Sequence, residues 1–80
     1  MRLDKYLKVT RIIKRRTVAN QACDTDRIIV NGKLAKASYE VKIGDIIEVQ
    51  LGARVLKVKV IEISEYFNKE TAMSGYEIIE

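Results

Sequence analysis

The stretch Ile28-Ile29-Val30-Asn31-Gly32-Lys33-Leu34-Ala35 marks the point where the chain changes from helical to strand periodicity. A run of β-branched residues is typical of a strand, and Asn-Gly is the strongest short signal for a two-residue hairpin turn. Residues 28–35 are therefore expected to form a β-hairpin. Because the pattern before this hairpin is helical and the pattern after it is extended, the sequence predicts helices first and a sheet second.

Two segments before the hairpin carry apolar residues at helical spacing. Residues 3–10 place their apolar side chains at positions i, i+3 and i+4, on one face of a short helix. A second helix is expected from about Arg15 to Thr25, with Asn20 among the residues on its outer face. The apolar stripe of this second helix is expected to consist of Val18, Ala19, Ala22 and Cys23.

After the hairpin, apolar residues alternate with polar ones as they do in β-strands. Residues 46–51 and 54–63 are expected to be strands, and residues 76–79 are expected to form a final strand. The alternation slips by one residue near Val60, which predicts a bulge or a strong bend there. The fold class is therefore α+β, with two short N-terminal helices packed on a small bent antiparallel sheet.

The composition argues against several classes of protein. The chain of 80 residues is sized for one domain, and it contains no histidine and a single cysteine. These residues build neither a zinc site nor a disulfide framework, and the sequence shows no nucleophile–base pair. We therefore expect a protein that is not an enzyme, holds no metal or cofactor, does not enter a membrane and lies in the reducing cytoplasm. The lone Cys23 is most simply a small core residue.

Positive charge is concentrated in the first quarter of the chain. Residues 1–20 contain seven cations and one anion, a net charge of +6, whereas residues 21–80 contain eight cations and ten anions, a net charge of −2. Such asymmetry is typical of a domain that binds a polyanion, either a nucleic acid or an anionic membrane surface. Because the domain core needs the small apolar face of the first helix, nucleic acid is the preferred interpretation.

The entry to the second helix is crowded with cations. Cations in the first turn oppose the helix dipole, and a sequence selected only for stability would carry a serine or threonine cap and an acidic residue there. The same position suits an anion, because backbone amides, the positive helix end and guanidinium groups all attract phosphate. The sequence therefore predicts phosphate binding by Arg11, Lys14, Arg15, Arg16 and Thr17, with Lys8 as a further cation nearby.

An ordered series of short motifs runs through the first part of the chain. It consists of Arg2-Leu3-Asp4, Leu7, Arg15-Arg16 with Ala19, Ile28, Val30-Asn31-Gly32-Lys33, Val41, Gly44-Asp45, Ile47 and Val49. This series resembles the RNA-binding domain named after ribosomal protein S-four, which is also called the alpha-L motif. The resemblance covers about residues 1–62 and leaves residues 63–80 as a C-terminal extension with room for a final strand.

The resemblance implies that two packed helices and a bent sheet present a basic face to structured RNA. It implies a role for Asp4 in orienting the neighbouring arginines. Asp26 stands where the family usually has a glycine at the end of the second helix, and aspartate tolerates the left-handed conformation that this position requires. Arg15 stands where the family usually has a serine cap. The implied RNA contacts are Arg2, Lys5, Arg15 and Arg16, with Lys36 and Lys42 at the margin.

Tyr39 has two interpretations. It follows Lys36 in a loop that also contains Lys42, so its ring is placed to stack on a nucleobase. A tyrosine in such a loop more often covers the edge of the core, and this second interpretation is favoured.

Residues 2–17 are also similar to short stand-alone members of the family that act in ribosome-associated quality control, relatives of the fifteen-kilodalton bacterial heat-shock protein. That similarity implies binding to large-subunit ribosomal RNA and to peptidyl-tRNA on stalled subunits, while a tailing factor of the RqcH type adds C-terminal alanine. We expect the chain to be monomeric away from the ribosome. Two alternatives stay open: a general ribosome-binding or subunit-maturation module that uses the same cations, and a protein–protein adaptor that uses the strand with Lys57 and Lys59.

Overall fold

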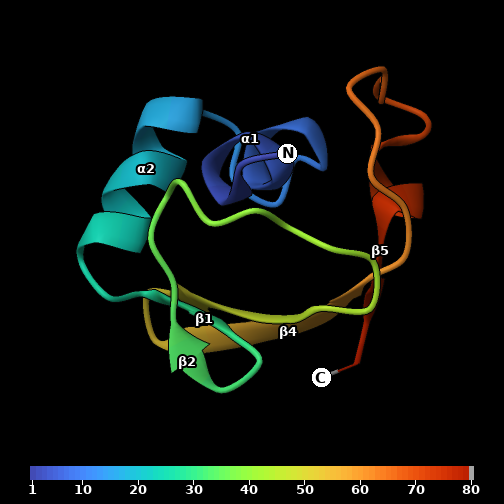
Figure 1. Cartoon of the computed structure of the whole chain (residues 1–80). Helices are drawn as coiled ribbons and strands as arrows, with labels where there is room; N and C mark the ends of the chain where they lie inside the picture. Colours follow the sequence, from blue (N-terminus) through green and yellow to red (C-terminus); the bar gives the residue numbers. More distant parts are fainter. Residues whose placement is uncertain (80) are drawn as a thin grey trace.

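Two helices lie on one face of an antiparallel sheet in the computed structural model, which describes residues 1–79 (Figure 1). Within these residues the sheet has five strands in the order β2-β1-β3-β4-β5. The α+β class and the helices-first order are confirmed. The elements are α1 (Leu3–Val9), α2 (Arg16–Asp24), β1 (Ile28–Val30), β2 (Lys33–Leu34), β3 (Ile46–Leu51), β4 (Arg54–Val60), a short 3-10 helix η1 (Ala72–Gly75) and β5 (Tyr76–Ile78).

The predicted hairpin is present and has the expected turn. Asn31 and Gly32 both have positive φ, at 52° and 82°, which is the conformation of a type I′ turn. Val30 pairs with Lys33 across this turn. On its other side β1 pairs antiparallel with β3, and Val30 lies opposite Ile47. The hairpin therefore sets the register of the sheet that supports the helices.

The core lies between α1 and the inner face of the sheet. Leu3, Tyr6 and Leu7 of α1 are fully buried, and they pack on strand residues that include Ile47 and Val58. Burying a side chain of this size contributes about 1.5–3 kcal/mol relative to leaving it exposed. The three α1 side chains thus stabilise both the fold and the position of the residues that follow Arg2.

Helix α2 packs through a narrower stripe than the sequence predicts. Ala19 and Cys23 are buried and Ala22 is half-buried, but Val18 is 46% exposed. The prediction for Val18 is therefore wrong. Two small residues one turn apart provide enough contact for close approach to α1, and Val18 lies to one side of them.

Strand β4 ends at Val60, three residues earlier than expected. The amides of Ile61 and Glu62 both donate to the carbonyl oxygen of Gly75, at 3.0 and 3.2 Å. A strand in which two successive residues lie opposite one residue of its partner, here Gly75, contains a β-bulge. The predicted break near Val60 is therefore present. The break turns the chain away from the sheet, and the chain returns as β5.

The segment after β4 packs against α1, as the orange and red part of Figure 1 shows. The Tyr6 hydroxyl donates to the carbonyl oxygen of Gly75 at 2.6 Å in the interior of the protein. Strand β5 then pairs with β4, with Tyr76 opposite Val60. Residue 80, the last residue of the expected extension 63–80, lies outside the described residues. Among the described residues, no helix combines the length and the apolar character that crossing a bilayer requires.

A buried carboxylate holds the loop between β2 and β3. Asp45 is 7% exposed and accepts hydrogen bonds from the Asn31 side chain, the Tyr39 hydroxyl and the Lys42 amide. Burial alone would raise the pKa of the Asp45 carboxyl, but these hydrogen bonds and the Lys42 charge lower it below its usual value. Tyr39 therefore covers the edge of the core, as the favoured interpretation of this residue requires.

Candidate RNA interface

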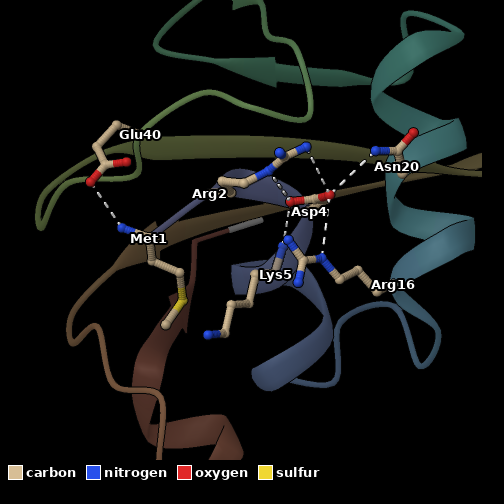
Figure 2. Close-up of polar contacts among 7 residues, drawn as sticks. All are labelled: Met1, Arg2, Asp4, Lys5, Arg16, Asn20 and Glu40. Carbon is tan, nitrogen blue, oxygen red and sulfur yellow. Dashed lines mark hydrogen bonds and ion pairs between the residues drawn. The ribbon is translucent and has the colours of Figure 1, made fainter.

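Asp4 is the centre of a polar cluster that joins the starts of the two helices (Figure 2). It lies in the first turn of α1 and is only 2% exposed, although it carries a carboxylate. The Lys5 amide donates to Asp4 Oδ1 at 2.8 Å, which is a favourable arrangement at the positive end of a helix. A carboxylate buried to this degree needs charged partners, and the cluster supplies two arginines.

Arg2 and Arg16 approach Asp4 from different elements. Arg2 donates from Nε to Asp4 Oδ1 at 3.2 Å and from a terminal nitrogen to Oδ2 at 3.4 Å. Arg16, in the first turn of α2, donates from Nε to Asp4 Oδ2 at 3.4 Å. Both arginine side chains remain about half exposed, at 49% and 48%. A guanidinium carries five N–H donors, so each arginine keeps donors for a phosphate while Asp4 fixes its position.

The cluster keeps Asp4 ionised. Burial alone would raise the pKa of the Asp4 carboxyl, but hydrogen bonds from Asn20, Arg2 and the Lys5 amide, together with the charge of Arg16, lower it below its usual value. At neutral pH the carboxylate therefore carries the negative charge that holds both guanidinium groups. The orienting role that the family resemblance implies for Asp4 fits this geometry.

Asn20 belongs to the cluster, and the prediction that it faces outward is wrong. Its Nδ2 donates to Asp4 Oδ2 at 3.3 Å. Asn20 follows Arg16 by four residues, so both lie on the same face of α2, and this face turns toward the start of α1. The sequence signal that identifies Asn20 is its i, i+4 spacing from the candidate residue Arg16. Thr17, Asn20 and Gln21 line a pocket of about 410 Å³ beside Asp4 and Arg16.

A second group of cations lies at the other end of α1. Lys8, Arg11 and Lys14 line a groove of about 250 Å³ together with Glu65 and Phe67 of the C-terminal segment. Within residues 1–79 none of these three cations forms an ion pair with a carboxylate. Their charges are therefore free to meet an anion from solution.

Arg11 has an unusual backbone conformation in this second group. Its φ is 60°, in the left-handed region that favours glycine, directly after the end of α1. Left-handed backbone at a residue other than glycine costs about 1–2 kcal/mol. The chain keeps an exposed arginine there, which places a cation at the negative end of α1 and on the edge of the groove.

The remaining predicted residues lie around these two groups. Lys5 Nζ pairs with Glu65 at 2.5 Å, and the hydrogen bond and charge of Lys5 lower the pKa of the Glu65 carboxyl. Arg15 is exposed and stands at the start of α2 without a side-chain capping hydrogen bond. Lys36 and Lys42 are exposed on the loop between β2 and β3. Within the described residues, the structure thus separates the predicted cations into two groups, one around Asp4 and one around Arg11. Outside these groups lie Lys5, which Glu65 holds, the exposed Arg15, and the two loop lysines at the margin.

Cys23 is a core residue, as expected. It is buried, and burial, followed by the charges of Asp4 and Asp24, raises the pKa of its thiol to about 11. A thiol with such a pKa remains protonated at neutral pH and is a weak nucleophile. In the part of the chain that the structure describes, no group of His, Cys, Asp or Glu residues is arranged to hold a metal ion.

The fold and this surface define a small α+β domain of alpha-L type, with arginines from two helices held by one buried aspartate. The S4 domain family model matches residues 1–47. An RQC P-site tRNA stabilizing factor of Streptococcus pneumoniae is 56% identical over 79 residues, which cover 99% of this chain and 90% of that protein. One of Bacillus subtilis is 48% identical over 79 residues, which cover 99% of this chain and 92% of that protein.

A solved structure agrees with these sequence matches. The trimeric structure of Vibrio cholerae heat shock protein 15 superposes with a TM-score of 0.91 at 29% identity, covering 98% of this chain and 80% of that one. The chain therefore belongs to the S4 domain family, and within it to the family of the RQC P-site tRNA stabilizing factors.

Proposed function

We propose that this chain is a non-catalytic RNA-binding factor of ribosome-associated quality control, which binds large-subunit ribosomal RNA and peptidyl-tRNA on stalled large subunits. The observation that carries the proposal is the cluster in which buried Asp4 holds Arg2 and Arg16 with half of each side chain exposed. The names of the relatives, which describe stabilisation of a P-site tRNA, support the same function.

The cluster suits phosphate recognition because its geometry exists before RNA arrives. Immobilising a flexible side chain on binding costs about 0.5–1.5 kcal/mol. Asp4 already restrains Arg2 and Arg16, so less of this cost falls on the binding step. Arginine is suited to such a site because its planar group binds phosphate through two parallel hydrogen bonds.

Two separate cationic groups favour contact with two RNA strands. The first group surrounds Asp4 at the start of α1, and the second lies beyond the end of α1 around Arg11. Binding two RNAs at once raises the effective concentration at the second site, which increases avidity without additional chemistry. Ribosomal RNA and the tRNA that a stalled large subunit retains form such a pair of strands.

We extend the proposal to the site residues, the partners and the domain limits. Bound in this way, the chain holds the tRNA in place while a tailing factor of the RqcH type adds alanine. It acts as a monomer away from the ribosome, with residues 1–62 as the RNA-binding part and residues 63–80 as an extension. The RNA contacts are Arg2, Lys5, Lys8, Arg11, Lys14, Arg15, Arg16 and Thr17, with Lys36 and Lys42 at the margin, while Asp4 orients the arginines.

Crosslinking in cells tests this function. Ultraviolet crosslinking of the full chain, followed by sequencing of the attached RNA, is expected to recover both large-subunit ribosomal RNA and tRNA. The combined variant Arg2→Ala and Arg16→Ala is expected to lose both. A control with Arg54→Ala and Lys69→Ala removes the same charge from exposed sites outside the cluster and is expected to retain them. Recovery of neither RNA, or equal losses in the two variants, would contradict the proposal.

A further inference from the structure

A pocket beside the hairpin is not used by the two cationic groups. It has a volume of about 660 Å³ and lies between the β1–β2 hairpin and the loop that follows β2. Val30, Leu34, Ala35 and Tyr39 line it. Leu34 is 60% exposed, although it lies in a strand. The pocket therefore presents an apolar surface to solvent.

Cations and neutral polar groups surround this apolar surface. Lys33 and Lys36 line the pocket together with Asn31 and Ser38, and none of the described residues that line it is acidic. An apolar surface with cations at its edge fits a ligand that combines a flat apolar body with negative charge. A nucleotide has this chemistry, because its base stacks and its phosphate is anionic.

The ring of Tyr39 is fixed before any ligand binds. Its hydroxyl donates to Asp45 Oδ2 at 2.8 Å, its amide donates to the Lys36 carbonyl oxygen at 3.0 Å, and its carbonyl oxygen accepts from the Leu3 amide at 2.8 Å. A ring held at both its tip and its backbone stacks on a base with little loss of conformational freedom. The anchoring of Tyr39 at the edge of the core thus suits it for a second role.

The pocket adjoins the Asp4 cluster through this same loop. The Leu3 amide donates to Tyr39, and the Asp4 amide donates to the Ala37 carbonyl oxygen at 3.2 Å. Tyr39, which lines the pocket, is therefore joined by a backbone hydrogen bond to Leu3, the residue before Asp4. Arg2 itself pairs with Glu40, the residue after Tyr39, so the arginine cluster and the pocket share this loop.

We infer that this pocket takes one unpaired nucleobase of the bound RNA, stacked on Tyr39, with its phosphate beside Lys33 and Lys36. The inference rests on the proposed function, since the arginine cluster brings the RNA strand to the pocket. A peptide that adds a strand to the sheet edge is the competing occupant, but β2 has only two residues and offers too short a ladder for it.

A short single-stranded RNA that contains 2-aminopurine is the probe. Leu34→Glu places a carboxylate in the pocket, and Leu34→Ala removes most of an apolar lining side chain without adding charge. Val55→Glu is the matched control, because Val55 is 59% exposed and lies beside the β3–β4 turn, at the opposite end of the sheet. Retention of the native amide spectrum shows that each variant is folded. The wild-type chain is expected to quench the 2-aminopurine fluorescence, and both Leu34 variants are expected to lose this quenching.

The affinities separate this inference from the function on which it rests. Loss of one stacked base is expected to weaken binding of the single strand at least about fivefold in Leu34→Glu, with no change in Val55→Glu. If RNA binding depends on Arg16 but not on Leu34, the inference about the pocket is overturned and the proposed function is not affected. RNA binding that is insensitive to Arg16→Ala contradicts the proposed function. The amide NMR shifts of Leu34 and Tyr39 are also compared on addition of the RNA and of an acidic apolar peptide. If the peptide shifts these two amides and the RNA does not, the inference is overturned in favour of a protein partner.

Discussion

Arg16 Nε lies 3.4 Å from Asp4 Oδ2, so that one buried carboxylate connects the first turn of α2 to the first turn of α1. A cation in the first turn of α2 opposes the dipole of that helix. Asp4 supplies the compensating negative charge from a neighbouring helix. The placement of Arg16 therefore becomes compatible with a stable fold, while half of its side chain stays available to a ligand.

Replacing Asp4 by asparagine is expected to reduce the free energy of unfolding by about 2 kcal/mol at pH 7, because charge-assisted hydrogen bonds to a buried group are lost. The folded-state pKa of Asp4 lies below its ordinary value of 3.8, so its contribution is present above about pH 4 and is lost as the pH falls through the folded pKa. Denaturant titrations of both chains at several pH values measure this difference. A difference that stays constant into strong acid would contradict the assignment of Asp4.

Arg15 and Arg16 provide a matched pair for separating binding from stability. Arg16→Ala removes a partner of buried Asp4 and is expected to destabilise the fold by about 1–2 kcal/mol. Arg15→Ala removes an exposed cation that forms no ion pair within residues 1–79, so stability is expected to change by less than about 0.5 kcal/mol. Each variant is expected to weaken RNA binding by about 1.5–3 kcal/mol, measured by titration at fixed salt. Equal melting temperatures for the two variants would show that the Asp4 contact of Arg16 has no structural role.

The backbone of Arg11 offers a variant in which RNA binding is lost with little loss of stability. Arg11→Gly relieves left-handed strain of about 1–2 kcal/mol, but it adds the entropy cost of glycine and removes a cation from the negative end of α1, so stability is expected to change by less than about 1 kcal/mol. The same change removes a groove cation and is expected to weaken RNA binding. Asp26→Gly is the control, because Asp26 has the same φ of 60° and carries no positive charge. Loss of RNA affinity in this control would show that backbone relief, and not the lost cation, is responsible.

Gly75 tests how the C-terminal segment packs on α1. A Cβ at this position would lie 2.8 Å from Phe67 Cζ and 2.9 Å from Thr10 Cγ2. Gly75→Ala is therefore expected to destabilise the fold by about 1–3 kcal/mol. Thermal unfolding measures the effect, and Ser74→Ala at the exposed neighbouring position serves as the control. A Gly75→Ala chain as stable as the control would mean that this segment is not packed closely on α1.

Local signals in the sequence were sufficient for the main elements of the fold. The Asn31-Gly32 turn, the alternation in β3 and the helical spacing of α1 each depend on neighbouring residues, and all three are confirmed. Asp26 adopts the left-handed conformation expected at the end of α2. Such features depend on backbone preferences over a few residues, which a single sequence expresses directly.

The errors concern contacts between elements. The outward prediction for Asn20 failed because the direction of an α2 side chain depends on where α1 places Asp4. The prediction for Val18 is wrong because a stripe in the sequence does not show how wide the contact between two helices is. The pairing of Lys5 with Glu65 was also not predicted, since sixty residues separate them along the chain. Relations of this kind are set by tertiary packing and require coordinates.

Cosedimentation with purified large ribosomal subunits, with and without peptidyl-tRNA, tests the central claim most directly. At one fixed salt concentration the wild-type chain is expected to prefer subunits that carry peptidyl-tRNA, because two RNA strands then meet the two cationic groups. The combined variant Arg2→Ala and Arg16→Ala is expected to lose this preference. Equal binding of the wild-type chain to both kinds of subunit would contradict the claim and would favour a general ribosome-binding module.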